Sequence, residues 1–222
     1  MTGPLEEQDD ASTPLTEEER EDLVPSYITL RRELNDAEQA NILEAEEWAF
    51  TRKRDVLDER FLNNLHKRMF GRVWRWAGRY RRSGKNVGVD AYRIPQELRQ
   101  FLDDCRFRIE NATYEPDEIA ARFHHKLVWI HLYPNGNGRH ARLAADLLLV
   151  ALGQPRFTWG SVSLVDPGKT RQLYVEALRA ADHHDIAPLL EFVRSWLQTI
   201  KQSLCSAWAN CRVFNTSFSI VA

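Results

Sequence analysis

The feature that most constrains the fold is a polar, glycine-rich segment, residues 131–142, which separates two apolar helical patterns. It reads His-Leu-Tyr-Pro-Asn-Gly-Asn-Gly-Arg-His-Ala-Arg. On both sides of it, apolar residues recur every three to four positions, as on the buried face of a helix. They are Ile119, Ala120, Phe123, Leu127 and Ile130 before the segment, and Leu143, Leu147 and Val150 after it. The pattern predicts two buried helices joined by a tight polar loop, whose backbone N–H groups need partners.

The chemistry of this loop favours an anionic ligand. Its centre, residues 135–138, reads Asn-Gly-Asn-Gly and predicts a turn, because both residue types tolerate positive φ. A helix that starts near Arg139 presents N–H donors and a positive dipole end to a phosphate. Arg142 lies on the same helix face as Arg139, and two guanidinium groups there favour a bound anion. His131 directly precedes the loop, where it can act as a general base toward a hydroxyl.

The segment resembles the signature of the Fic/Doc family, His-x-Phe-x-(Asp/Glu)-Gly-Asn-(Gly/Lys)-Arg-x-x-Arg. Members of that family transfer a nucleoside monophosphate, usually AMP from ATP, to a protein hydroxyl. The resemblance implies that His131 is the catalytic base, which deprotonates a Ser, Thr or Tyr of a target protein. It also implies nucleotide binding by the loop and both arginines, that is, by Asn135, Gly136, Asn137, Gly138, Arg139 and Arg142.

Two positions depart from the signature. Tyr133 replaces the usual Phe and retains an aromatic ring. Asn135 stands where the family has an acid that binds magnesium, and an amide oxygen ligates Mg²⁺ without the charge. The resemblance therefore implies ATP as substrate and Mg²⁺ as cofactor, with the metal held weakly at Asn135. Transfer from another phosphate donor and a non-catalytic nucleotide-binding module are the alternatives that this asparagine leaves open.

A second similarity lies upstream. Residues 76–81 read Trp-Ala-Gly-Arg-Tyr-Arg and resemble a segment common before the Fic loop. Residues 83–94 alternate small and β-branched residues, which predicts a β-hairpin. By resemblance this hairpin is a flap that docks the target by strand addition, and an ordinary surface loop is the alternative. The expected flap residues are Lys85, Asn86, Val87, Gly88 and Val89.

A resemblance to an inhibitory segment lies near the N-terminus. Residues 27–35 predict a short helix or turn, and some Fic proteins carry a helix with the pattern (Ser/Thr)-x-x-x-Glu-(Gly/Asn) there. The run from Thr29 to Glu33 resembles it, except that a leucine precedes the asparagine. The resemblance implies that Glu33 pairs with Arg142 and restrains activity. A Thr-x-x-x-Glu run is also common in ordinary helices.

The fold expected from these patterns is mainly α, a Fic-type helical bundle with a small β-hairpin flap. Asn35 or Asp36 is expected to cap the first long helix, Gly71 to end the next, and Asp185 to cap the last. Apolar spacing predicts helices at 36–54, 58–70, from Pro95 onward, and at 116–130, 139–152, 169–182 and 185–197.

Length and composition fit one folded domain with appendages, because 222 residues with 43% hydrophobic content can build a core. We expect a disordered acidic lead at 1–24, a Fic domain at 25–200 and a tail without clear periodicity at 201–222. The lead carries nine acidic residues and one arginine, which leaves a net charge of +6 on the remainder. That charge suits a nucleotide and is too small to indicate DNA.

Location and partners follow from what the sequence lacks. The sequence contains no run of 18 apolar residues, so we expect no membrane span. The acidic N-terminus does not resemble a secretory signal. Cys105, Cys205 and Cys211 have no metal-binding spacing, which fits a reducing cytoplasm. The Asn-Gly-Asn-Gly loop resembles the bacterial Fic subgroup called mobile mystery protein B. Residues 61–89 combine basic and aromatic side chains. We interpret the tryptophans as core residues rather than as a nucleic-acid-binding surface. The sequence leaves open whether the protein forms a homo-oligomer.

Overall fold

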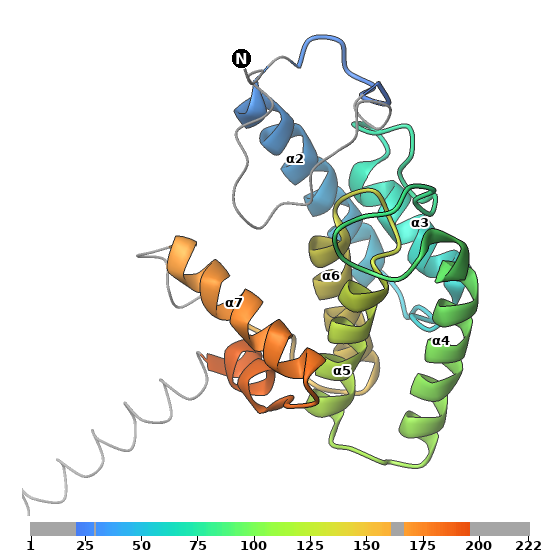
Figure 1. Ribbon diagram of the computed structural model, residues 1–222, viewed down its shortest axis with the longest axis vertical. Helices are drawn as coiled ribbons and strands as arrows, with labels where there is room; N and C mark the ends of the chain where they lie inside the picture. Colours follow the sequence, from blue (N-terminus) through green and yellow to red (C-terminus); the bar gives the residue numbers. More distant parts are fainter. Residues whose placement is uncertain (1–20, 29, 161–166, 196–222) are drawn as a thin grey trace, which may run out of the picture. The chain divides into compact units, whose positions relative to one another are not determined.

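The computed structural model describes residues 21–28, 30–160 and 167–195. The described residues fall into two compact units, which divide between Arg156 and Phe157. Expectations for the rest of the acidic lead, for Thr29 and for the tail at 201–222 lie outside the described residues. Across the ranges that are described, the regular elements are helices, with a single isolated bridge and no strand (Figure 1). The mainly α class predicted from the sequence is confirmed.

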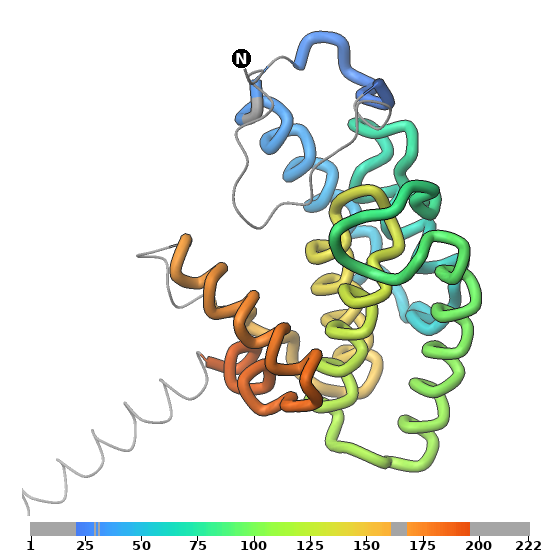
Figure 2. The backbone as a smooth tube through the Cα atoms, viewed as in Figure 1, coloured from blue at the N-terminus to red at the C-terminus, as the bar shows by residue number. Residues whose placement is uncertain are grey.

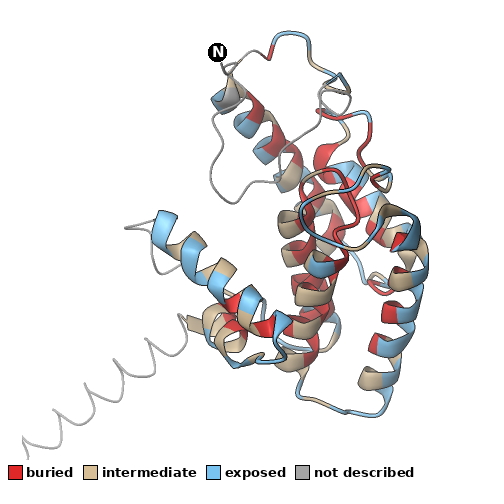
Figure 3. Ribbon diagram, viewed as in Figure 1, coloured by how far each residue is buried: buried red, intermediate tan, exposed pale blue. Residues whose placement is uncertain are grey.

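The first unit is a bundle of α-helices joined by loops. Helix α5 packs against α6 and α4, while α2 packs against α3, which also contacts α4 and α6. Buried residues concentrate on α5 and α6, the two helices that flank the polar loop (Figure 3). The helices are α2 (Arg31–Phe50), α3 (Glu59–Phe70), α4 (Ile94–Glu110), α5 (Pro116–Ile130) and α6 (Asn137–Ala151), with a 3₁₀ turn η1 (Ala91–Arg93) before α4.

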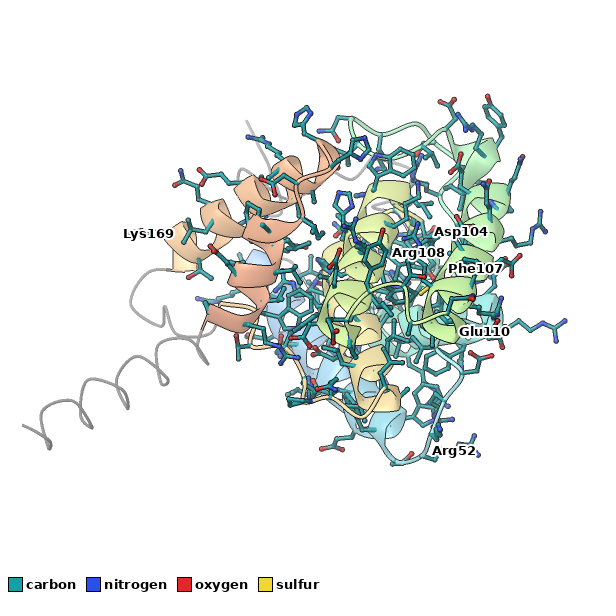
Figure 4. The ribbon with its side chains drawn as sticks, turned by 90° about the horizontal axis from the view of Figure 1, so that it is seen from below. Arg52, Asp104, Phe107, Arg108, Glu110 and Lys169 are labelled. Atoms are coloured by element: carbon teal, nitrogen blue, oxygen red, sulfur yellow. The ribbon has the colours of Figure 1, made fainter. Side chains whose placement is uncertain are left out.

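Helix α4 shows how the apolar spacing positions an element. Leu98 and Leu102, one turn apart, are buried in the core. Asp104, Phe107 and Glu110 are exposed on the other side of the helix (Figure 4). Burying such a stripe of leucines contributes about 1.5–3 kcal/mol per side chain and holds α4 in place beside α5.

Helices α2 and α6 begin earlier than the sequence predicts. Helix α2 begins at Arg31, so Asn35 and Asp36 lie inside it and the prediction that either residue caps it is wrong. The earlier start is stabilised because the Glu33 carboxylate accepts the Leu30 N–H at 3.1 Å. Helix α6 begins at Asn137, two residues before the expected Arg139, because Gly136 already supplies its N-cap.

The predicted β-hairpin is not formed, since residues 83–90 make a loop without strands. The backbone around this loop bonds instead to the connection between α5 and α6. Arg81 donates its N–H to the Leu132 carbonyl at 3.0 Å, and Val89 donates to Ile130 at 3.4 Å. The loop therefore runs beside the start of the polar segment (Figure 2).

A short backbone pairing joins the N-terminal segment to residues 73–75. Leu23 and Trp74 form an isolated antiparallel bridge. Val24 donates to the Val73 carbonyl at 2.8 Å, and Arg75 donates to Asp22 at 2.9 Å. This pairing fixes the chain directly after α3, where the Trp-Ala-Gly segment begins.

The second unit contains α7 (Pro167–Asp182) and a helical stretch at 187–195. The expected cap at Asp185 is confirmed, because its carboxylate accepts the Ala187 N–H at 3.1 Å. Tyr174 of α7 packs against Phe192, with ring centroids 5.6 Å apart. Within the part of the chain that the structure describes, each helix is too short or too polar to cross a lipid bilayer.

Candidate active site

His131 caps the C-terminal end of α5 in the left-handed conformation, with φ 58° and ψ 67°. Its N–H donates to the Leu127 carbonyl at 3.2 Å, and the residue is 6% exposed. A non-glycine residue in this conformation is uncommon and costs on the order of 1 kcal/mol, and such residues cluster at functional sites. The helix end therefore fixes the backbone of the expected base at the entrance of the loop.

The electrostatic surroundings of His131 keep its ring neutral. Burial lowers its pKa to about 4, and the charges of Arg81 and Lys85 act in the same direction. A hydrogen bond with the Val128 backbone partly opposes them. At neutral pH the imidazole is uncharged, and an uncharged ring can accept a proton. This is the protonation state that a general base needs.

Gly136 sits at the tightest point of the loop, in the left-handed conformation with φ 78°. A Cβ atom on it would lie 2.6 Å from two ring carbons of Phe70. Because no real Cβ contact is this short, only glycine fits between the loop and α3. The loop thus lies directly against Phe70, and its close approach defines the start of α6.

Asn137 holds the loop in shape through its side chain. Its Oδ1 accepts the Tyr133 N–H at 2.9 Å, and its Nδ2 donates to the Tyr133 carbonyl at 2.8 Å. The side chain is buried, and both its polar atoms are used in this pair of bonds. Asn137, one of the residues expected to bind phosphate, therefore uses its side chain to hold the loop itself.

His66 supports the loop from α3, a role that the sequence pattern did not indicate. Its Nδ1 accepts the Gly78 N–H at 2.9 Å, so Nε2 carries the proton and donates to the Asn135 carbonyl at 3.1 Å. Its ring stacks on Tyr133 with centroids 3.6 Å apart. Burial is the main reason why the pKa of His66 lies well below its usual value, and it keeps the ring neutral.

The first arginine of the motif is held by an acid that sequence reasoning missed. Arg139 Nη1 lies 2.6 Å from Oε2 of Glu38 on α2. The other carboxylate oxygen of Glu38 accepts the Trp74 Nε1–H at 2.6 Å, and Glu38 is only 5% exposed. Glu38 is an acid on the buried stripe of α2, between Leu34 and Ala45. An acid on such a stripe is the sequence signal that could have identified it.

The second arginine, Arg142, lies one turn further along α6 and faces α5. The pKa of His124 is lowered to about 3, mainly by burial and next by the charge of Arg142. Glu33, its expected partner, accepts the N–H of Leu30 at the start of α2. The ion pair between Glu33 and Arg142 stays a prediction.

The expected flap residues do reach the histidine, although without strand structure. Gly88 has φ 93°, and a Cβ on it would lie 2.5 Å from Cβ of His131 and 3.0 Å from the Ile130 carbonyl. Val87, next to it, is 47% exposed. Lys85 is near enough to lower the pKa of His131. Residues 85–89, called the flap loop below, therefore lie directly against His131.

The residues of the loop do not fit a conventional magnesium site. In the ranges 21–28, 30–160 and 167–195, no three His, Cys, Asp or Glu residues form a group able to hold a metal ion. The side-chain oxygen of Asn135 accepts the Gly136 N–H at 2.5 Å and carries no net charge. Mg²⁺ prefers carboxylates, whereas Asn135 offers the ion a neutral oxygen that is already hydrogen-bonded.

Comparison with known proteins places this geometry in a family. The model of the Fic/DOC family matches residues 56–149, from before α3 into the last turn of α6. A protein adenylyltransferase Fic of Nematostella vectensis is 33% identical over 147 residues, which cover 64% of this chain and 33% of the relative. The Drosophila melanogaster protein of the same name is 32% identical over 144 residues, covering 63% of this chain and 27% of its own. The chain thus spans about a third or less of these relatives.

Solved structures share the fold. BepC, an effector protein of Bartonella tribocorum solved with bound AMPPNP, superposes with a TM-score of 0.62 at 17% identity, over 80% of this chain and 96% of its own. A Fic protein of C. elegans gives 0.61 at 22% identity, over 83% of this chain and 56% of that chain. These identities establish a common fold and no more. The histidine, the glycine loop and the paired arginines lie in register within residues 56–149, the part of this chain that matches the Fic/DOC family.

Proposed function

We propose that this chain is a protein adenylyltransferase, which transfers AMP from ATP to a Ser, Thr or Tyr hydroxyl of a target protein. The observation that carries the proposal is the state of His131. It is neutral because it is buried, and the left-handed end of α5 fixes it directly before the glycine loop. The adenylyltransferase names of the Nematostella and Drosophila relatives support the same reaction.

The proposed reaction is an in-line displacement at the α-phosphorus. The target hydroxyl gives its proton to His131 while its oxygen bonds to that phosphorus. The bond from phosphorus to the bridging oxygen of the β-phosphate breaks, and pyrophosphate leaves. Because Asn135 offers a cation only a neutral oxygen, charge neutralisation is assigned to the N-terminus of α6 with Arg139 and Arg142. Positioning and this electrostatic stabilisation supply most of the rate enhancement.

The proposed partner is a protein segment that lies along the flap loop. Val89 of the loop donates its N–H to the Ile130 carbonyl, while Val87 and Gly88 are exposed. An extended target segment that pairs with this exposed backbone would present its hydroxyl to His131. The bacterial cytoplasm, expected from the sequence, is the proposed location, since scattered cysteines suit a reducing compartment.

The test is transfer of label from α-labelled ATP to protein in a bacterial lysate, with added Mg²⁺. Wild type is expected to label one or more proteins, and His131→Ala to label none while still binding AMPPNP. His183→Ala, a change at an exposed histidine of the second unit, serves as the control and should match wild type. Persistent label with His131→Ala would remove the histidine from the role of base.

A second candidate is a non-catalytic nucleotide-binding module. Two contacts favour it. The uncharged side chain of Asn135 is hydrogen-bonded to Gly136, and Arg139 is paired with Glu38. This candidate predicts that wild type binds AMPPNP and labels nothing. Asn135→Asp then discriminates between the two, since restoring the acid should give metal-dependent transfer only if the missing charge is what prevents catalysis.

A further inference from the structure

A buried arginine outside the Fic signature connects the flap loop to the catalytic position. Arg81 is 2% exposed, and its guanidinium donates to three backbone carbonyls. Nε donates to His131 at 2.7 Å, Nη1 to Ser83 at 3.0 Å, and Nη2 to Val89. Its own N–H donates to Leu132 at 3.0 Å. One side chain therefore bonds to the expected base and to both sides of the flap loop.

These bonds replace the strand ladder that the flap lacks. Buried backbone carbonyls need hydrogen-bond donors, and the loop receives them from the Arg81 side chain. Gly88 packs into the same contact, because a Cβ on it would lie 2.9 Å from Arg81 Nη2 and 2.5 Å from Cβ of His131. The loop, the guanidinium and the histidine thus form one packed unit in which none can shift alone.

We propose that Arg81 is a positioning residue, which fixes the flap loop relative to His131 so that a docked hydroxyl meets the ring. The inference rests on the proposed transfer reaction and adds the residue that aligns its two parts. Only a guanidinium has enough donors in one plane to bond three carbonyls that point from different directions. A lysine keeps the charge but not this fork.

The charge of Arg81 provides a readout that packing alone would not move. The charged groups that act on the His131 ring are Arg81, from the segment after α3, and Lys85, from the flap loop. Both charges lower the pKa of His131, although burial is the larger cause. Loss of the guanidinium charge should therefore raise the pKa of His131, while substitution by lysine should leave much of the electrostatic effect in place.

The experiment compares Arg81→Gln and Arg81→Lys with Arg82→Gln, which alters the exposed neighbour. The pKa of His131 is followed by NMR of its ring, and transfer is followed with α-labelled ATP. Arg81→Gln should raise the pKa of His131. Both Arg81 variants should lose about 10- to 100-fold in transfer, the usual effect of misplaced reacting groups, and bind AMPPNP as wild type does. Arg82→Gln should change none of these.

Two further measurements keep the test decisive. If wild type transfers no label, the proposed function fails, and exchange of the Val89 amide hydrogen, bonded to Ile130, still tests Arg81. That exchange should accelerate in Arg81→Lys. If the Arg81 variants do not fold, Gly88→Ala separates the loop from His131 directly and should lower transfer with AMPPNP binding retained. Wild-type transfer or wild-type amide exchange in Arg81→Lys, or an unmoved His131 pKa in Arg81→Gln, would overturn the proposal.

Discussion

Glu38 and Arg139 form an ion pair of 2.6 Å between α2 and the first turn of α6, although 101 positions separate them in the chain. Glu38 is buried while Arg139 is partly exposed, and Trp74 fixes the carboxylate with a further hydrogen bond. An internal carboxylate therefore occupies a guanidinium that the family signature associates with phosphate. A nucleotide that uses Arg139 must compete with it.

Glu38→Gln should tighten nucleotide binding. The amide oxygen can still accept from Trp74, but the charge that competes for Arg139 is gone. We expect the dissociation constant for AMPPNP to fall about tenfold, measured by calorimetry, which corresponds to roughly 1.4 kcal/mol. The control is Glu44→Gln, a change on the same helix as Glu38 that breaks an exposed pair with Arg72. Weaker binding with Glu38→Gln would mean that Arg139 is structural.

Glu33→Gln should raise transfer if Glu33 restrains Arg142 as the family pattern implies. The substitution keeps an oxygen for the Leu30 N–H, so the start of α2 is retained. Label transfer from α-labelled ATP is the measurement, with Glu47→Gln, an exposed change on α2, as control. An unchanged rate would leave Glu33 with a capping role alone.

Gly136→Ala should destabilise the fold more than Gly153→Ala, although both glycines have φ 78°. The strain of a left-handed alanine, about 1–2 kcal/mol, is common to both. A Cβ at Gly136 would meet ring carbons of Phe70 at 2.6 Å, whereas a Cβ at Gly153 would have nothing within 4 Å. Denaturant unfolding of the two variants isolates the steric contribution. Equal losses would show that α3 and the loop move apart easily.

Stability should fall on acidification below about pH 6.5. Burial lowers the pKa of His131 and His140 to about 4 and that of His124 to about 3. The unfolded chain therefore binds protons that the folded chain excludes. Each such histidine costs up to about 1.4 kcal/mol for every pH unit below 6.5 until its folded pKa is reached. Urea unfolding at pH 7.5, 6 and 5 measures this, and a flat profile would contradict the burial of these rings.

His66→Phe should weaken both the fold and the loop. Phenylalanine can stack on Tyr133, but it leaves the Gly78 N–H and the Asn135 carbonyl without their partner. Such losses cost about 1–3 kcal/mol each when the groups are buried. Thermal unfolding and AMPPNP affinity should both decline, while His183→Phe, at an exposed site, should change neither. Normal affinity in His66→Phe would mean that the loop keeps its shape without this support.

The helices were predictable because apolar spacing is a local property of the sequence. The α5 bounds at 116–130 agree with the prediction, and α3 differs by one residue. The missed residues act through partners far along the chain. Arg81 bonds a residue 50 positions away, and His66 bonds one 69 positions away. Spacing within a helix carries no information on such contacts.

The hairpin prediction was wrong for a related reason. Small and β-branched residues around Gly84 and Gly88 are compatible with strands, but a strand also needs a partner. Here the nearby backbone of residues 130–132 and the side chain of Arg81 supply the hydrogen bonds. The secondary structure of the loop depends on contacts that no local pattern encodes.

The pairing of residues 22–24 with residues 73–75 has a practical consequence for dissecting the chain. The family match begins at residue 56, yet the residues that complete the fold around Trp74 come from further upstream. A recombinant fragment cut at residue 56 would lack this pairing and Glu38, and would expose the apolar side of α3 that α2 covers. Such a fragment should aggregate or be digested rapidly by proteases. The boundary of the signature is therefore not the boundary of the folding unit, and fragments should begin ahead of Asp22.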